Sequence, residues 1–460
     1  MSRGAVVLGI DVGTTTLKAV AVDGSGVVVA SASAPNTWDV DDHGNVQIDM
    51  DVLADRAIAV LADAAAQSGA PVAGIGIAGL AETGVVLDGA GHPLTPGFAW
   101  YDQRGAAGLA ALPEGFRAEF SAVTGLAAKA ECSFAKLLWL RANDAVSLPG
   151  TTWLNALEYI AYRLCGAMAT EPSLASRTGL LDQAGIAPWP GALERIGADA
   201  AFLPALVPAG TSIGVVGADG PVGLRGAAVT VAGHDHLVNS VGAGATGGDD
   251  LFDSCGTADV ILRTVPRVLS NDERAVLVGR GLSAGRHVLA GSTAILGATR
   301  SGLVLGRILS MLGAFSRDER QRIADTWQAD SARSSIVEVS EPPGWTNEVT
   351  VRLRDDASPQ EVWAAGMHYV LDQTEDLLAA IADIAGPYEH AVAAGGWAHV
   401  RGVLRGKAQL MPGLTLSEQE QAGAFGAARF AAHAAGVEIG AATLSLPITV
   451  PQHPTKEYVS

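Results

Sequence analysis

The segment from Asp11 to Thr15, Asp-Val-Gly-Thr-Thr, joins two apolar runs and has residue types that suit phosphate binding. A glycine turn can present successive backbone N–H groups and threonine hydroxyls to an anion. The carboxylate of Asp11 could hold a hydrated Mg²⁺ ion beside the phosphates. An ordinary hairpin turn that contains an acid is the alternative interpretation of Gly13, Thr14 and Thr15.

A second acid, Asp235, follows the apolar run 229–232 in the segment Gly-His-Asp-His. An acid at the carboxyl end of a strand can project into a cleft and accept a proton from a substrate hydroxyl. Metal ligation by His234, Asp235 and His236 is a competing hypothesis. It is disfavoured because neighbours on a strand point to opposite faces and no further ligand is near. A polar loop after a strand is the third interpretation.

Two further glycine-containing dipeptides and two acidic segments complete the candidates. Gly256-Thr257 and Gly395-Gly396 could let backbone approach a ligand, because glycine has no Cβ; a plain turn is the alternative. Glu82 follows the buried strand predicted over 72–78. The segment 100–104, Trp-Tyr-Asp-Gln-Arg, combines an apolar ring face with a carboxylate, as sugar sites do. A surface loop with an Asp–Arg ion pair is its alternative.

The elements that must position these residues follow an α/β plan. Apolar patterns and a Gly-rich turn predict a three-stranded meander over 6–10, 17–22 and 27–30. Helical spacing over 51–67 and a buried strand over 72–78 come next. The segment around 251–263 weakly resembles the opening hairpin in sequence. This indicates a second half of the chain that begins near residue 245. Two helices are expected there, with Ser-x-x-Glu caps at Ser358 and Ser417 and ends at Gly386 and Gly436.

Composition narrows the functions open to the 460-residue chain. It has 48 acidic and 30 basic residues, a formal net charge of −18, and five lysines. We therefore expect neither nucleic acid nor an anionic membrane surface as a partner. Three widely spaced cysteines, a start without a signal-peptide pattern and no long apolar run predict a cytoplasmic protein. The 56 glycines are unusually many for this length.

Taken in order, the segments resemble the FGGY family of carbohydrate kinases, within the actin, hexokinase and heat-shock ATPase superfamily. The likeness runs from about residue 5 to 440. The matching stretches are IDVGTTTLKAVAVD at 10–23, HGNVQIDMDVL at 43–53, WYDQR at 100–104, SFAKLLWL at 133–140, YRLCGAMATEPSLASRTGLLD at 162–182, GHDHLVNSVGAG at 233–244, DSCGTADVIL at 253–262, AAGGWAHVRGVL at 393–404 and GAFGAARFAAHAAG at 423–436.

The resemblance implies an α/β fold of two RNase H-like, actin-like ATPase domains around a central interdomain cleft. Residues 1–244 would bind the sugar and carry the first phosphate loop and the catalytic acid, and 245–460 would bind the nucleotide. It implies that Asp235 is the catalytic base and that Asp11 is the acid associated with Mg²⁺. The implied ATP-binding positions are Gly13, Thr14, Thr15, Gly256, Thr257, Gly395 and Gly396. The implied acceptor-binding positions are Glu82, Trp100, Asp102 and His236.

Several segments depart from the family pattern. Family members frequently have Gly-Gln or Gln-Met-His at the position where this chain has Leu80-Ala81-Glu82. They commonly have smaller residues at the position of Trp397. The region 305–358 lacks the usual Gly-Glu-Arg-x-Pro segment. Arg401 and Arg405 are candidates for an anionic ligand group, with ordinary surface arginines as the favoured alternative.

The leading hypothesis is an ATP-dependent kinase of a small sugar, sugar acid or polyol. The alternative is a nucleotide-binding regulator or degenerate kinase of the same fold. A chaperone-type ATPase is less favoured, because no peptide-binding domain is evident after residue 440. A metal-dependent hydrolase built on the two histidines comes last. Family members are often dimers, so the resemblance allows a homodimer.

Overall fold

A computed structural model describes residues 4–328, 331–342, 348–440 and 445–447 of the chain. The chain forms two compact units, and neither is continuous in sequence. The first unit comprises Met1–Asp250, Leu262–Gly297 and Gln419–Leu444, and the second comprises Leu251–Ile261, Ala298–Glu418 and Ser445–Ser460. The functional division at residue 244 that the sequence suggests stays a prediction.

The first unit is built on a six-stranded mixed sheet with the order β12-β13-β6-β1-β2-β3. β1 (Val6–Val12), β2 (Thr16–Val22) and β3 (Val28–Pro35) form the predicted antiparallel meander. β6 (Val72–Gly79) and β13 (Ala228–His234) run parallel to β1. The register aligns Val12, Gly79 and His234, so three strands end together at one edge of the sheet.

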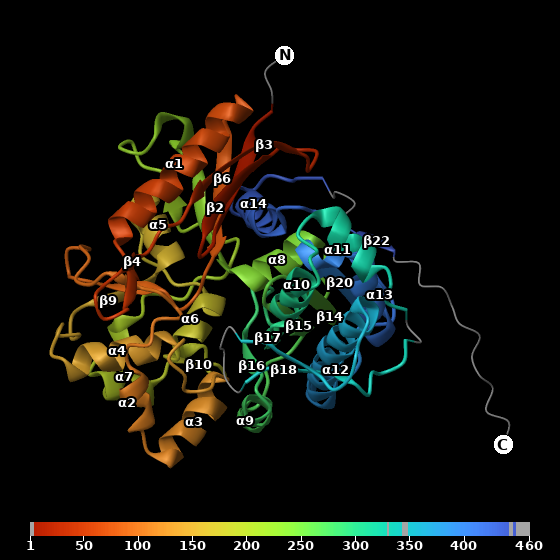
Figure 1. The fold of residues 1–460 in the computed structure, drawn as a ribbon. Coiled ribbons are helices and arrows are strands. Elements are labelled where there is room, and N and C mark those ends of the chain that lie inside the picture. The colour runs from red at the N-terminus through yellow and green to blue at the C-terminus, as the bar shows by residue number, and fades with distance from the viewer. Residues whose placement is uncertain (1–3, 329–330, 343–347, 441–444, 448–460) are drawn as a thin grey trace. The chain divides into compact units, whose positions relative to one another are not determined.

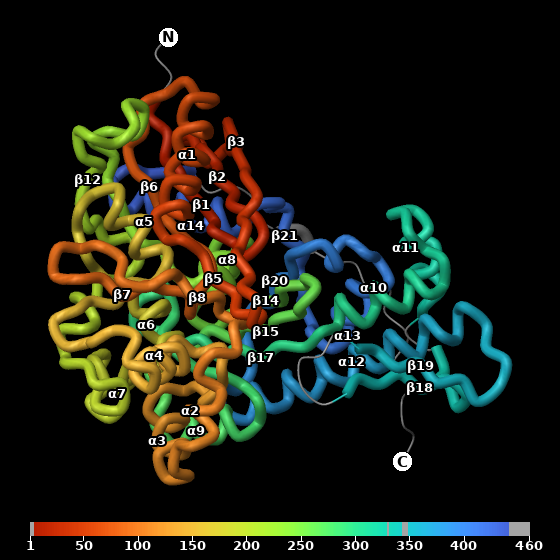
Figure 2. Tube along the Cα trace, turned by 60° about the vertical axis from the view of Figure 1, so that its left-hand side comes forward, coloured from red at the N-terminus to blue at the C-terminus, as the bar shows by residue number. Residues whose placement is uncertain are grey.

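Helices cover both faces of this sheet, because residues along its strands alternate between two apolar cores. α1 (Met50–Ser68) and α5 (Ala156–Cys165) pack on the face that Leu8 and Ile10 occupy. α14 (Ala422–Ala435) packs on the opposite face with Val7, and α8 (Asp235–Ala243) packs against α14. The blue α14 lies beside the red opening strands in Figures 1 and 2, although the two are far apart in sequence.

Glycine allows the close approach of α14 to the sheet. Gly9, Gly74 and Gly76 face backbone carbonyls of α14, and a Cβ at Gly74 would lie 2.6 Å from the carbonyl oxygen of Ala431. A real Cβ is not found so near a backbone oxygen, so larger residues here would push the helix away. Part of the high glycine content therefore serves this contact.

The rest of the first unit forms a second core of aromatic residues, among them Phe116, Phe120, Phe134 and Trp189. The first unit also contains β4 (Asp39–Val40), β5 (Val46–Ile48), β7 (Gly84–Leu87), β8 (Gly97–Phe98), α2 (Ala106–Ala110), α3 (Glu114–Thr124), α4 (Ser133–Ala142), β9 (Thr152–Asn155), α6 (Pro172–Thr178), β10 (Leu181–Asp182), β11 (Ala187–Pro188), α7 (Pro190–Ile196), η1 (Ala200–Phe202), β12 (Gly214–Val215), η2 (Val222–Leu224), α9 (Asn271–Gly279) and β16 (Ser283–Arg286). β15 (Asp259–Val265) and β17 (Thr293–Thr299) contain boundaries between the units.

The second unit places β14 (Asp250–Cys255), β20 (His390–Ala394), β21 (Leu414–Ser417) and β22 (Ser445–Pro447) next to one another in that order. Its apolar core joins α10 (Ser301–Met311) to α12 (Pro359–Ala385) and includes Leu305, Trp363 and Met367. Its remaining elements are α11 (Arg317–Ala324), β18 (Val337–Ser340), β19 (Thr350–Leu353), η3 (Gly396–His399) and α13 (Arg401–Leu410).

One of the two predicted helix caps is confirmed and the other is wrong. Ser358 caps α12 with Glu361 in a capping box, and that helix ends before Gly386. Ser417 instead ends β21, and α14 begins five residues later at Ala422 with no side-chain cap. Antiparallel pairing with Ser445 of β22 holds Ser417 in extended backbone, and this tertiary contact overrides the local capping pattern. Gly436 ends α14 as predicted.

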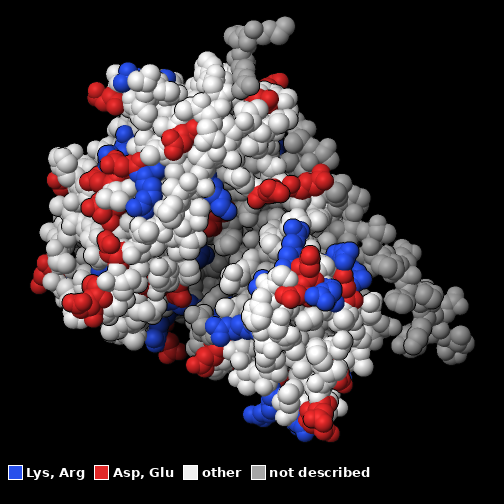
Figure 3. Space-filling model, turned by 45° about the horizontal axis from the view of Figure 1, so that its top comes forward, with Lys and Arg blue, Asp and Glu red and all other residues white. Residues whose placement is uncertain are grey.

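Acidic and basic side chains are interspersed among uncharged atoms on the face of the molecule drawn in Figure 3. Within the described ranges, none of the helices combines the length and the apolar character needed to cross a membrane.

Candidate active site

In the turn between β1 and β2, hydrogen bonds from Asn36 and Trp38 fix the backbone carbonyl groups of Gly13, Thr14 and Thr15. Asn36 donates to the carbonyl of Gly13 through its side chain (3.0 Å) and to that of Thr15 through its backbone N–H (2.9 Å). The indole of Trp38 donates to the carbonyl of Thr14 at 2.7 Å. In a trans peptide the N–H points opposite the C=O, so the following N–H groups point away from Asn36 and Trp38. This arrangement suits a loop that binds an anion through its backbone.

Asp11, at the end of β1, has a carboxylate that suits a bound cation. Its Oδ1 atom is buried and accepts no hydrogen bond from the described residues. Burial, with a contribution from the negative charge of Asp235, raises the pKa of Asp11 to about 7. A desolvated carboxylate oxygen that lacks a donor is the type of ligand that Mg²⁺ prefers. The residues present therefore fit the predicted metal ion.

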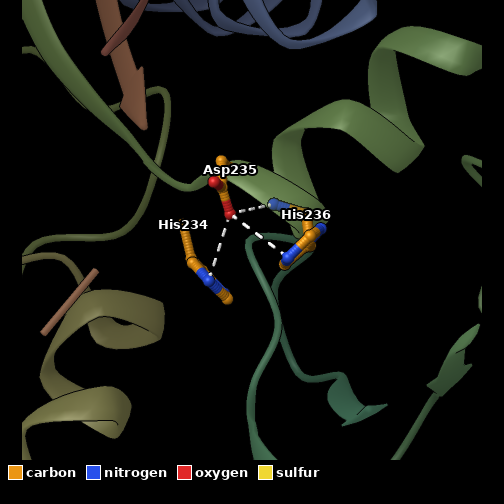
Figure 4. A group of neighbouring side chains, drawn as sticks. All are labelled: His234, Asp235 and His236. Atoms are coloured by element: carbon orange, nitrogen blue, oxygen red, sulfur yellow. Dashed lines mark hydrogen bonds and ion pairs between the residues drawn. The ribbon is translucent and has the colours of Figure 1, made fainter. Parts of the chain in front are cut away.

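Asp235 is the first residue of α8, directly after β13 (Figure 4). Its Oδ1 atom accepts the backbone N–H of His236 at 2.6 Å and lies 3.2 Å from Nε2 of His234. No described residue makes a hydrogen bond to Oδ2, and the side chain is 34% exposed. Burial opposes ionisation, but His236, His234 and Arg177 outweigh it and lower the pKa of Asp235. Asp235 is thus an ionised carboxylate. A hydrogen bond fixes its Oδ1 atom, and its Oδ2 atom is available to a ligand.

The side chains of His234 and His236 both lie close to Asp235, although the strand pattern predicts that neighbouring side chains point to opposite faces. The segment turns into a helix at Asp235, so possible ligand atoms of His234, Asp235 and His236 all lie within 4.8 Å of one another. Burial lowers the pKa of His234 to about 3, which keeps its ring neutral, and its Nε2 atom lies 3.2 Å from Asp235 Oδ1. Among the described residues, no fourth ligand joins this group. A hydrogen-bonded carboxylate explains the geometry without a transition metal.

A buried acid supports the backbone that carries Asp235. Ser173 Oγ accepts the N–H of His234 at 3.1 Å and donates to the carboxylate of Glu171. A Cβ at Gly233, where φ is +113°, would lie 2.9 Å from that carboxylate. Burial raises the pKa of Glu171 to about 8. Glu171 and Ser173 therefore fix the backbone immediately before Asp235.

Glu82 lies just beyond β6 and has φ +63°, a left-handed conformation that is unusual for a residue with a Cβ. It is 7% exposed, and its Oε1 atom accepts from Nε of Arg177 at 2.6 Å. Ser133 donates to its carbonyl at 2.8 Å. Burial raises the pKa of Glu82 and the negative charge of Asp235 adds to that effect, while Arg177 opposes both.

Trp100 and Asp102 lie in one loop but have different surroundings. The indole of Trp100 donates to Thr14 Oγ1 at 3.1 Å, which links this loop to the turn after β1. Both oxygens of Asp102 are occupied: Arg104 donates at 2.8 and 3.0 Å, and Val46 N–H donates at 2.6 Å. Burial opposes ionisation of Asp102, but these hydrogen bonds outweigh it and lower its pKa. In this structure Asp102 anchors the loop, and its contact with an acceptor stays a prediction.

The glycine motifs of the second unit pack against each other. A Cβ at Gly395, where φ is +100°, would lie 2.6 Å from the carbonyl oxygen of Cys255, the residue before Gly256. The indole of Trp397 packs on α10, where a Cβ at Gly302 would lie 2.6 Å from its Nε1 atom. The predicted second phosphate loop and adenosine motif are thus neighbours, with the unusual tryptophan at their side.

A buried ion-pair cluster lies under the Gly256-Thr257 turn. Lys407 Nζ donates to both oxygens of Asp253, at 2.8 and 2.7 Å, and to Asp259 at 2.6 Å. Asp253, Cys255 and Asp259 have the spacing of a metal site, but the ammonium group already takes the position of a cation. Lys407 joins α13 to the strands on either side of the turn.

The structure joins two of the predicted residues of the first unit, Thr14 and Trp100, by a hydrogen bond, and it places Asp11 where the negative charge of Asp235 raises its pKa. It also shows contacts that the sequence analysis missed, from Asn36, Trp38, Arg177 and Lys407. Arg177 lies within a quoted motif, but nothing in its spacing indicates Glu82 as its partner. Arg401 and Arg405 both lie beside Asp325, as surface arginines would.

Residues 6–242 match the FGGY family of carbohydrate kinases, N-terminal domain. The chain is 31% identical over 269 residues to an L-fuculokinase from Escherichia coli (strain K12), and the match covers 56% of each protein. It is 34% identical over 226 residues to a glycerol kinase from Gloeobacter violaceus, covering 47% of this chain and 45% of the relative. The chain thus spans about half the length of the curated relatives it matches.

Solved structures extend the likeness to nearly the whole chain. The crystal structure of xylulose kinase from Rhodospirillum rubrum has a TM-score of 0.83 at 23% identity, and the match covers 97% of this chain and 94% of that one. At this identity the likeness concerns the fold, and it confirms the predicted α/β, actin-like ATPase class.

Proposed function

The chain belongs to the FGGY family of carbohydrate kinases, and from this premise we propose that it transfers the γ-phosphoryl group of ATP to a hydroxyl of a small sugar, sugar acid or polyol. The observation that carries the proposal is the carboxylate of Asp235, with Oδ1 fixed by His236 and His234 and with Oδ2 without a partner among the described residues. A general base needs such an oxygen within hydrogen-bond reach of the hydroxyl.

In the proposed reaction, Asp235 Oδ2 accepts the hydroxyl proton as the acceptor oxygen forms its bond to the γ-phosphorus. The bond from that phosphorus to the bridging oxygen breaks, and ADP leaves. The N–H groups after Gly13, Thr14 and Thr15 and the turn at Gly256-Thr257 are proposed to bind phosphate oxygens, with Gly395 and Gly396 beside the nucleoside. Asp11 would hold Mg²⁺, which neutralises phosphate charge when it is bound. Glu82, Trp100 and His236 are proposed to contact the acceptor.

The proposed function is tested by a coupled assay of ADP release with a panel of pentuloses, hexuloses, aldonates, polyols and glycerol. We expect saturable, acceptor-dependent turnover with at least one of them. ATP binding without transfer to any acceptor would favour the nucleotide-binding regulator instead. Absence of both ATP binding and turnover would refute the kinase proposal.

Chelation gives a further prediction about the acidic site. Because Asp11 and Asp235 place negative charge beside the proposed phosphates, removing Mg²⁺ should weaken ATP binding about tenfold, or about 1.4 kcal/mol. Calorimetric titration of ATP with and without EDTA measures this change. EDTA saturated beforehand with Mg²⁺ is the matched control and should have no effect. ATP affinity that is the same in both would contradict a role for the metal.

A further inference from the structure

Arg177 makes the closest charged contact with Glu82, and the sequence assigns it no role. Its Nε atom lies 2.6 Å from Oε1 of Glu82, and its Nη1 atom donates to Ser283 at 3.1 Å. The two side chains are 22% and 8% exposed. A guanidinium held at two points by partners on different elements has little freedom to turn toward another anion.

The backbone of Glu82 is fixed as firmly as its side chain. The left-handed φ of +63° carries a cost for a residue with a Cβ, and such conformations persist where the surroundings impose them. Ser133 holds the carbonyl, and Arg177 holds Oε1. No described residue makes a hydrogen bond to Oε2, so this oxygen can accept one from a ligand hydroxyl.

α6 (Pro172–Thr178), which carries Arg177, also supports the proposed general base. Ser173, one turn earlier on this helix, accepts the N–H of His234 next to Asp235. Arg177 and His234 line one small cavity together with Ser173. One short helix thus fixes both the pair formed with Glu82 and the backbone before Asp235.

The charges around Glu82 do not suit a second carboxylate. The negative charge of Asp235 contributes to raising the pKa of both Glu82 and Asp11, so the three acids lie near one another. The cations that interact with Glu82 are Arg177 and Lys136. Arg177 is already paired, and the buried ammonium of Lys136 donates to the carbonyls of Trp100 and Ala130. A carboxylate on the acceptor would meet like charge and find both cations occupied.

We propose that the Glu82–Arg177 pair selects a neutral, polyhydroxylated acceptor and excludes sugar acids, with Glu82 accepting a hydroxyl and Arg177 as its positioning residue. This inference rests on the proposed kinase function and narrows its acceptor. A neutral acceptor needs only hydrogen-bond acceptors, which Glu82 and Asp235 supply. A sugar acid would place its own carboxylate beside the negative charges of Glu82 and Asp235, while Arg177 is already hydrogen-bonded to Glu82.

The test uses acceptor pairs that differ only in a terminal CH₂OH or COO⁻ group: xylitol and xylonate, glucitol and gluconate, glycerol and glycerate. For the wild-type protein we expect kcat/KM to be roughly 100-fold higher for the neutral member of each productive pair. Glu82→Gln keeps the size of the side chain but releases Arg177. It should therefore reduce that preference at least about tenfold, with the KM for ATP unchanged.

Two further variants separate selectivity from folding. Glu82→Gln combined with Arg177→Gln removes both charges and should leave no strong preference for either member of a pair. Arg163→Gln breaks a surface pair with Asp55 (2.9 Å) in the same unit and should leave the preference unchanged. Wild-type preference for the acids, or a preference that Glu82→Gln does not alter, would overturn the inference while leaving the kinase proposal intact. Absence of turnover with every acceptor, together with the absence of ATP binding, would overturn both.

Discussion

Replacing Asp235 with asparagine is expected to lower the rate of phosphoryl transfer roughly 10²–10⁴-fold, the range of a general base, while ATP binds almost as before. The amide has the size of the carboxylate but cannot take a proton from the acceptor hydroxyl. The contacts that fix Oδ1, from the N–H of His236 and from His234, can still be made by the amide oxygen. The change therefore removes the proton acceptor with little change in shape.

Single-turnover kinetics with saturating ATP measure the chemical step for this variant, and calorimetry measures its ATP affinity. Asp199→Asn is a matched control, because Asp199 caps an exposed turn in the same unit and asparagine can also cap. It should leave the rate within about twofold of the wild-type value. A comparable rate for Asp235→Asn would show that another group accepts the proton.

Lys407→Met should destabilise the second unit by about 3–5 kcal/mol, the range seen when one partner of a buried ion pair is removed. Lys407 is 2% exposed, and Asp253 and Asp259 are 0% and 2% exposed. Without the ammonium group, two carboxylates would remain buried next to each other. Burial and the charge of Asp259 already raise the pKa of Asp253 well above its ordinary value.

Denaturant unfolding, followed by probes in each unit, measures this loss as a shift of the second unit's midpoint. The matched comparison is a triple variant that also carries Asp253→Asn and Asp259→Asn. It removes every charge of the cluster, so it should recover most of the lost stability. If Lys407→Met unfolds at the wild-type midpoint, the cluster contributes little. If the triple variant is no more stable than the single one, packing around the lysine stem explains the loss instead.

Much of the first unit follows from local sequence patterns. The meander, the helix after it and the strand that ends near Asp235 are confirmed, because their apolar periodicity and turns agree with their tertiary surroundings. Asp11 and Asp235 could be predicted to lie near each other once β1 and β13 were placed with their carboxyl ends at one edge. The remaining residues of the site are set by contacts between segments that are far apart in sequence, and local patterns do not predict such contacts.

Three residues show where local reasoning ends. Arg177 reaches Glu82 across 95 positions of sequence, and Lys407 reaches Asp253 across 154. No spacing rule links positions so far apart, because the pairing is set by the fold. Ser417 has a good capping pattern but lies in a strand, since its pairing with the neighbouring strand prevails.

The place of α14 has a consequence for how the chain is made. A ribosome releases β1, β2, β6 and β13 long before it reaches Ala422, and until then the face that α14 covers has no helix on it. The glycines on that face present backbone, but Val7, Val20 and Val22 lie on it too, so the surface exposes apolar side chains to other chains until α14 covers it. The first unit thus begins folding early in synthesis but can finish only near its end. Premature termination anywhere before α14 leaves it incomplete.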